Sequence, residues 1–163
     1  MNYRAIQGVI HRPYKTVIKV VDGDGLVVQD LFSKEEEEIR LCGIDAPELK
    51  RCKKLIQDEK ETHLAGELLI KLGWQSFQFL NAKVPPGTNC TLLQEPGIQI
   101  DYYGRTLAYV ILPDGKCLNE EMIREGYSKP YDKIFCTSLP WFQELNLQAK
   151  TQRKGLYSQV TWF

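Results

Sequence analysis

Residues 14–44 read YKTVIKVVDGDGLVVQDLFSKEEEEIRLCGI and predict three consecutive β-strands. Apolar and β-branched residues dominate three runs, at 14–21, 26–31 and 38–44, which short polar segments separate. The segment DGDG at 22–25 is typical of a tight turn, because Asp and Gly supply local hydrogen bonds and positive φ angles. Connections this short join antiparallel neighbours, since a parallel crossover needs a longer link. We therefore expect an antiparallel meander of three strands at the start of the chain.

The remainder of the chain predicts one long helix, two further strands and two further helices. Apolar residues recur every three or four positions through 55–79, which predicts a single helix. The segments 89–94 and 107–112 predict strands, and 118–125 and 141–153 predict helices that glycines end. The order β-β-β-α-β-β-α-α favours an α+β fold: a five-stranded oligonucleotide/oligosaccharide-binding (OB) barrel with three helices.

Composition places the chain among ordinary globular domains. It has 163 residues, of which 43% are hydrophobic, enough to bury one substantial core. Lys and Arg number 21, as do Asp and Glu, so the net charge is zero and a polyanion must be held by a local patch. The five cysteines are odd in number and lack C-x-x-C spacing, which favours free thiols in a reducing compartment.

Location and membrane contact are inferred from apolar runs. The sequence shows no apolar stretch of signal-peptide length near its start and no run approaching the ~18 apolar residues of a membrane span. We therefore expect a cytoplasmic protein with no membrane partner, or a secreted one if a leader has been trimmed.

Four carboxylates gather near the ends of the predicted strands: Asp22, Asp24, Asp45 and Glu48. Hard cations such as calcium prefer oxygen ligands, and two carboxylates with a backbone carbonyl and waters would satisfy one ion. The DGDG segment also fits a plain hairpin turn, and it lacks the spacing of an EF-hand loop.

Cationic side chains lie near the same strand ends. Arg40 stands in an otherwise apolar strand, so its side chain either extends to solvent or meets an anion. Arg105 follows Tyr103-Gly104 just before a predicted strand, a pattern that plain turns also show. The segment KRCKK at 50–54 either guides a polyanion to the site or is a solvated loop.

Three motifs in chain order resemble the staphylococcal nuclease family. They are VDGDG at 21–25, IRLCGIDAPE at 39–48 and YGRTLAY at 103–109. The resemblance includes NEEMIREG at 119–126, in the place of the family's second helix. It implies the barrel fold and a nuclease domain over 14–157, preceded by an arm at 1–13 and followed by a tail at 158–163.

The resemblance also implies an activity and a metal. It implies a calcium-dependent, sugar-nonspecific nuclease that cleaves phosphodiester bonds of DNA and RNA, leaving 3′-phosphate and 5′-hydroxyl ends. By motif position, Asp24, Asp45 and the backbone carbonyl of Ala46 are the implied calcium ligands, with Asp22 behind them. Glu48 matches the general base that orients the attacking water.

The implied substrate contacts come from arginine and tyrosine. Arg40 and Arg105 match the two arginines that bind the scissile phosphate, a role that suits the planar guanidinium fork. Tyr103 matches a tyrosine that contacts a nucleotide phosphate. Tyr131 is the residue we expect to pack on the nucleotide, with Tyr127 as the second choice.

A function from another class is a barrel that has lost turnover and only binds nucleic acid or protein. Because every position implied for metal, base and phosphate keeps a suitable residue, we expect the active enzyme. We further expect a monomer whose partners are its DNA and RNA substrates, with no obligate protein partner.

Overall fold

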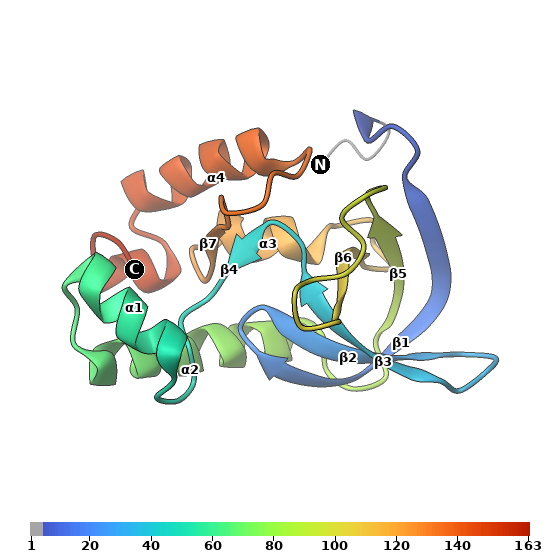
Figure 1. The fold of residues 1–163 in the computed structure, drawn as a ribbon, viewed down its shortest axis with the longest axis horizontal. Coiled ribbons are helices and arrows are strands. Elements are labelled where there is room, and N and C mark those ends of the chain that lie inside the picture. The colour runs from blue at the N-terminus through green and yellow to red at the C-terminus, as the bar shows by residue number, and fades with distance from the viewer. Residues whose placement is uncertain (1–4) are drawn as a thin grey trace.

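The computed structural model describes residues 5–163, in which a closed barrel is flanked by helices (Figure 1). The barrel strands are β1 (Ile10–Asp22), β2 (Gly25–Asp30), β3 (Glu36–Leu41), β5 (Asn89–Gln94) and β6 (Thr106–Ile111). They close in the order β1-β2-β3-β6-β5, and β3 and β6 are parallel while the other neighbours are antiparallel. The α+β fold with a five-stranded barrel and an initial meander is confirmed.

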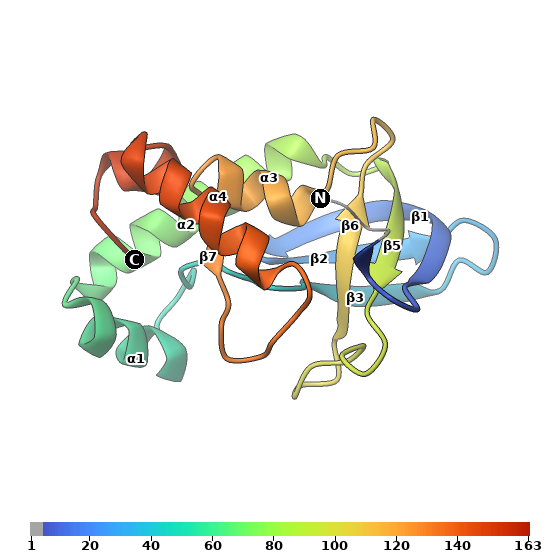
Figure 2. The ribbon, with the colours of Figure 1, turned by 90° about the horizontal axis from the view of Figure 1, so that it is seen from above.

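Helices and one small ribbon complete the molecule. These elements are β4 (Ile44–Asp45), α1 (Lys53–Thr62), α2 (Gly66–Lys83), α3 (Leu118–Arg124), β7 (Lys129–Pro130), α4 (Leu139–Thr151) and the 3-10 helix η2 (Gly155–Ser158). Strands β4 and β7 pair with each other outside the barrel. The helices gather at one end of the barrel and the β2–β3 hairpin projects from the other (Figure 1 and Figure 2).

The predicted third strand, 38–44, is divided in the structure. Strand β3 ends at Leu41, and Gly43 has a φ of 76°, a left-handed conformation that glycine adopts without strain. The chain therefore leaves the barrel and reaches Ile44 in β4, paired with β7. This departure places Asp45 beyond the barrel's end, where the carboxylates meet.

The prediction of one helix over 55–79 was wrong, because the chain bends between α1 and α2. His63 has a φ of 59°, and its N–H bonds back to the carbonyl of Glu59 as helix α1 ends. Gly66 then starts α2 directly against the Glu59 side chain, where a Cβ would overlap its carboxylate. The molecule accordingly has four α-helices and not three within the described residues.

Buried apolar residues form two clusters. The first fills the barrel and includes Val17 and Ile39, and the second lies between the helices and includes Leu55, Leu72 and Leu156. The helical cluster fixes α1 and α2 relative to each other, and α2 also packs against β1. A rigid frame of this kind is what can hold side chains from distant segments at one place.

All five cysteines are free, and four of them are buried, in agreement with the expected free thiols. Burial is the principal reason that the pKa values of Cys90 and Cys117 lie above the usual range. Among residues 5–163, no helix is long and apolar enough to cross a membrane.

Candidate active site

A cleft of about 870 Å³ opens where the barrel meets α1 and the loop between β5 and β6. Seven carboxylates and five cationic side chains line it, so the lining is acidic on balance. The carboxylates are those of Asp22, Asp24, Glu38, Asp45, Glu48, Asp58 and Asp101, and the cations are Arg40, Lys53, Lys54, Arg105 and Lys133. An acidic lining with interspersed cations attracts a metal ion and still offers donors to an anion.

Asp24 and Asp45 converge from two different elements. Asp24 lies in the turn between β1 and β2 and Asp45 lies in β4, and both are buried. Asp24 Oδ2 and Asp45 Oδ1 each lie 3.3 Å from Arg40 Nη2. Burial raises the pKa of Asp24 to about 6, although Arg40 acts in the opposite direction. The site therefore carries a charge that the fold alone does not fully compensate.

Ala46 takes part in this arrangement through its backbone. Its N–H donates to Asp24 Oδ2 at 2.8 Å, which ties the turn of Asp24 to the segment after β4. Asp22 supports the same turn, because its Oδ1 accepts the N–H of Asp24 at 3.1 Å. The predicted ligand residues Asp24, Asp45 and Ala46 thus lie together in the structure.

Two glycines allow the close packing that places these groups. A Cβ on Gly23 would lie 2.6 Å from the Cβ of Ala46, so the turn and the β4 segment could not approach as they do. A Cβ on Gly73 in α2 would lie 2.7 Å from the carbonyl oxygen of Pro47, the residue before Glu48. Helix α2 therefore supports the segment that carries Asp45 and Glu48.

Arg40 is held by several partners at the centre of the site. Nη1 donates to the carbonyl oxygens of Leu41 and Ile44, at 3.1 and 2.8 Å, while Nη2 faces Asp24 and Asp45. Burial works to lower its pKa, but the two aspartates outweigh burial and raise it. Of the two alternatives left by the sequence, Arg40 therefore meets anions and does not extend to solvent.

Glu48 lies half-buried on the same side of the cleft. Burial raises its pKa above the usual range, and the neighbouring ammonium of Lys54 opposes that rise. Lys54 Nζ lies 3.4 Å from Glu48 Oε1 and 3.3 Å from Asp45 Oδ2. A carboxylate with a raised pKa is a better proton acceptor near neutral pH than an exposed one.

Arg105 reaches the cleft from the loop before β6. Asp101 orients it, because Oδ2 accepts from the Arg105 Nε at 2.7 Å and Oδ1 accepts from its backbone N–H at 2.8 Å. This ion pair uses Nε and leaves the terminal guanidinium nitrogens outside it. The guanidinium also lies 5.6 Å from the ring centroid of Tyr103, which is 80% exposed.

Tyr131 lines the cleft, and Tyr127 does not. The Tyr131 ring centroid lies 5.7 Å from the guanidinium carbon of Arg40. The Tyr127 ring instead stacks on Phe79 at a centroid distance of 4.2 Å, between the two apolar clusters. Of the two tyrosines considered from the sequence, Tyr131 is therefore the one at the cleft.

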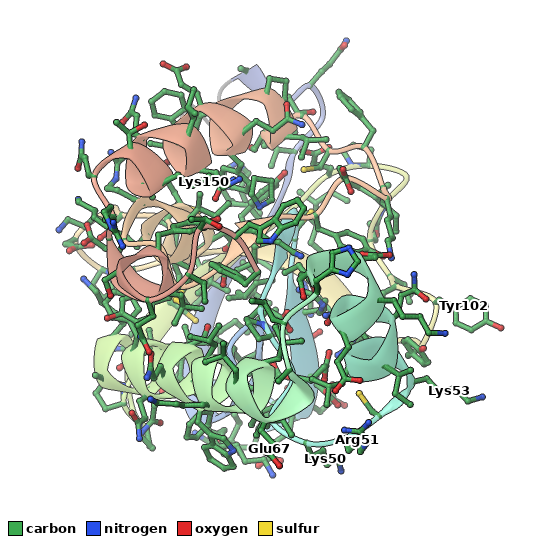
Figure 3. All side chains as sticks on the ribbon, turned by 90° about the vertical axis from the view of Figure 1, so that its left-hand side faces the viewer. Lys50, Arg51, Lys53, Glu67, Tyr102 and Lys150 are labelled. Carbon is green, nitrogen blue, oxygen red and sulfur yellow. The ribbon has the colours of Figure 1, made fainter. Side chains whose placement is uncertain are left out.

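The basic segment 50–54 divides into outward and inward residues. Lys50, Arg51 and Lys53 are exposed, and Lys53 projects on the same side of the molecule as Tyr102, while Lys50 and Arg51 lie at its lower edge (Figure 3). Tyr102 is 96% exposed in the loop opposite α1. Lys54 instead faces the carboxylates of the cleft. We call these three exposed residues the basic rim. Lys53 lines the cleft, and Arg51 forms an ion pair with Glu59.

The donor set suits a hard cation. Two buried carboxylates, Asp24 and Asp45, converge on the guanidinium of Arg40 in an acidic cleft, and oxygen ligands are those that calcium prefers. Within residues 5–163 no group of three or more His, Cys, Asp or Glu side chains is arranged to hold a metal. The expected ligand set needs only two such side chains, because its remaining ligands are a backbone carbonyl and water.

The sequence does not single out several charged residues of the cleft, among them Lys54, Asp58 and Asp101. Lys54 was included only as a member of the basic segment. The spacing of four between Lys54 and Asp58 on one helix is the signal that could have paired these two residues.

Comparison of the sequence with known proteins identifies its family. A family model described as staphylococcal nuclease homologue matches residues 38–159, which is most of the chain. The chain belongs to the staphylococcal nuclease family. The matched span of this staphylococcal nuclease homologue includes β4, α1, α2 and the loop that carries Arg105.

Individual relatives of this staphylococcal nuclease homologue come from bacteria and archaea. An uncharacterized endonuclease of Escherichia coli is 32% identical over 144 residues, covering 88% of this chain and 76% of its own length. An uncharacterized protein of Methanocaldococcus jannaschii is 28% identical over 167 residues, covering 96% and 77%. Endonuclease YhcR of Bacillus subtilis is 29% identical over 148 residues, which is 88% of this chain and 11% of YhcR.

Proposed function

We propose that this protein is a calcium-dependent nuclease that hydrolyses phosphodiester bonds of DNA and RNA and leaves 3′-phosphate and 5′-hydroxyl ends. One observation carries the proposal: a single cleft brings together two buried aspartates, a half-buried glutamate and two arginines. Membership of the staphylococcal nuclease family, and relatives named as endonucleases, support the same reaction class.

Asp24, Asp45 and the carbonyl of Ala46 are the groups that would hold the calcium ion. When bound, such an ion stabilises negative charge on a phosphate and makes a coordinated water more acidic. Arg40 contributes by holding both carboxylates in place in the absence of metal, through contacts of 3.3 Å to each. The protein thus arranges its ligands before the ion arrives.

Glu48 would accept the proton of the attacking water. Its burial raises its pKa, so its basicity is greater than that of an exposed glutamate. The ammonium of Lys54, 3.4 Å from Glu48 Oε1, opposes this rise in pKa because it stabilises the carboxylate. A positioned general base typically contributes ~10²- to 10⁴-fold to a rate.

The arginines would bind the scissile phosphate and stabilise the charge that builds on it in the transition state. Arg105 has terminal nitrogens outside its ion pair with Asp101, and these suit a bidentate contact with two phosphate oxygens. Arg40 lies deeper, with its terminal nitrogens on two carbonyl oxygens and on Asp24 and Asp45. It would contact the phosphate only through Nη2, once Nη2 is released from the aspartates. Each well-placed donor of this kind is worth ~10²- to 10³-fold in rate.

Aromatic side chains at the cleft would contact the nucleotides next to the scissile phosphate. Tyr103 and Tyr131 both line the cleft, and each lies near a guanidinium that would bind phosphate. Base stacking on aromatic rings tolerates every base, because each base has a π-face. Contacts of this kind suit an enzyme that does not select sequence or sugar.

The test is to incubate the purified protein with labelled single-stranded DNA and RNA of the same sequence, in calcium or in chelator. We expect cleavage of both in calcium, none in chelator, and fragments that carry 3′-phosphates. Cleavage that leaves 3′-hydroxyls, or that proceeds in chelator, would contradict the proposed chemistry. Binding without cleavage would instead identify an inactive nucleic-acid-binding module.

A further inference from the structure

Lys54 occupies an unusual place for a lysine of a basic surface segment. It lies in the first turn of α1, and its ammonium contacts three carboxylates of the cleft. The distances from Nζ are 3.3 Å to Asp45 Oδ2, 3.4 Å to Glu48 Oε1 and 3.0 Å to Asp58 Oδ2. Its side chain is 36% exposed, so part of it remains in contact with solvent.

The partners of Lys54 belong to different parts of the proposed machinery. Asp45 is an expected calcium ligand, and Glu48 is the expected base. Asp58 lies one helical turn further along α1 and forms the shortest of the three contacts. Lys54 can therefore give up Asp45 and still keep an anionic partner on its own helix.

The neighbouring Lys53 shows that this placement is not a general property of the segment. Lys53 also lines the cleft, but its side chain is exposed and projects away from the molecule (Figure 3). Among the ion pairs described for residues 5–163, none involves Lys53. The two adjacent lysines thus carry the same charge at the same cleft, but only Lys54 contacts carboxylates directly.

We propose that Lys54 is a built-in counter-cation of the metal-free site, which holds Asp45 and Glu48 in place and competes with calcium for Asp45. The inference rests on the proposed function, since it takes Asp45 as a calcium ligand. A cation bound to a carboxylate oxygen must be displaced before a metal binds that oxygen, which lowers the apparent metal affinity. Lys54 therefore raises the calcium concentration at which the site fills, in addition to any effect of Arg40 at the other oxygen of Asp45.

The proposal is tested by calorimetric calcium titration of the wild-type protein, Lys54→Met and Lys53→Met, without nucleic acid. Methionine keeps an unbranched side chain and removes the charge. We expect Lys54→Met to bind calcium about 10-fold more tightly than the wild type, within the range of ordinary coupling between sites. Lys53→Met, which removes the same charge from the same cleft, should change the affinity by less than about threefold.

A thermal melt in chelator provides a second readout. Lys54→Met leaves three carboxylates without their shared cation, so it should melt below the wild type, and saturating calcium should narrow the difference. Lys53→Met should melt with the wild type in both conditions. Three results would overturn the proposal. The two lysine variants bind calcium with equal affinity, Lys54→Met binds it more weakly than the wild type, or neither Lys54→Met nor the wild type binds calcium.

A second pair of variants covers the case in which Lys54→Met does not fold. Asp58→Asn removes the helical partner of Lys54, so the ammonium depends more on Asp45 and calcium should bind more weakly than to the wild type. Glu59→Gln removes the same charge one residue further on and should have a smaller effect. Equal effects of the two substitutions on calcium affinity would overturn the proposal.

The inference and the proposed function can fail separately. A protein whose calcium affinity depends on Lys54 but which cleaves no nucleic acid would contradict the nuclease and retain this inference.

Discussion

The two sides of the cleft are built in different ways. On one side, Asp24, Arg40 and Asp45 come from the barrel end and β4 and are largely buried, and each aspartate lies 3.3 Å from Arg40. On the other side, Tyr103 and Arg105 come from the loop before β6, and Tyr103 is 80% exposed. The first side resembles a core and the second resembles a surface.

This difference predicts which variants change stability as well as catalysis. Buried charges destabilise a fold unless they are paired, so the carboxylate side should affect both stability and catalysis. Exposed side chains on a loop contribute little to folding, so the loop side should affect catalysis and binding alone. Variants on the two sides should therefore be distinguishable by thermal stability even where their activities fall equally.

The largest effect on turnover is expected for Glu48→Gln. Loss of the general base should lower the cleavage rate by ~10²- to 10⁴-fold, while the melting temperature changes little because Glu48 is half-buried and its amide replacement is isosteric. Glu38→Gln is the matched control, since Glu38 is an exposed carboxylate that lines the same cleft. The assignment of the base fails if single-turnover kinetics show Glu48→Gln cleaving at the parental rate.

The two arginines give the sharpest test of the comparison. Arg40→Lys and Arg105→Lys should each lower the rate by ~10²- to 10³-fold, because lysine does not reproduce a bidentate contact. Arg40→Lys should also reduce the free energy of unfolding by about 1–3 kcal/mol, since the carbonyl oxygens of Leu41 and Ile44 lose their donor. Arg105→Lys should melt close to the wild type. Unchanged rates in both variants would exclude the arginine clamp.

Asp24→Asn should stabilise the metal-free protein above pH 6. Burial raises the pKa of Asp24 from 3.8 to about 6, so its neutral form favours folding below pH 3.8 and that contribution is lost as the pH rises through 6. At pH 7.5 in chelator, the asparagine should raise the free energy of unfolding by about 1–3 kcal/mol, and the gain should shrink toward pH 4. Denaturant titration at both pH values measures this change in the free energy of unfolding. A loss of stability at pH 7.5 would mean that the pairing of Asp24 with Arg40 stabilises the fold more than burial of its charge destabilises it.

The smallest effect is expected at the basic rim. Replacing Lys50 and Lys53 together by alanine should weaken nucleic-acid binding several-fold and reduce the slope of log affinity against log salt by about 1 per lysine. Alanine at Lys150, an exposed lysine of α4 on another part of the surface, should leave both unchanged (Figure 3). Fluorescence anisotropy at several salt concentrations, in chelator, is the measurement. An unchanged salt slope would make the segment a solvated loop.

Most of the fold could be predicted because its signals are local. The apolar runs and short turns fix the meander, and the strand 89–94 is found as predicted. The division between α1 and α2 could not be read from periodicity, because Leu64 and Leu68 keep the helical spacing across the bend. There, the left-handed conformation of His63 ends α1 and turns the chain, and the apolar spacing does not show it.

The site was predicted in part, for a related reason. Most of the residues named by motif position line one cleft in the structure. Tyr131, which was expected without a motif match, lines the cleft as well, whereas Tyr127 does not. The motif positions did not name Lys54, because a cation in a basic segment looks the same in sequence whether it faces water or carboxylates. Its direction is set by the position of α1 against the β4 segment, which is a property of the tertiary structure.

The central claim is that the buried carboxylates at the barrel end hold the calcium that cleavage requires. Its most direct test is a single-turnover cleavage assay of wild-type protein and Asp45→Asn across a calcium titration, with calcium binding measured on the same samples. We expect calcium-dependent cleavage by the wild type, and for Asp45→Asn both weaker calcium binding and a rate lower by ~10²-fold or more at any calcium concentration. Equal cleavage by the two proteins, or cleavage by the wild type in chelator, would contradict the account.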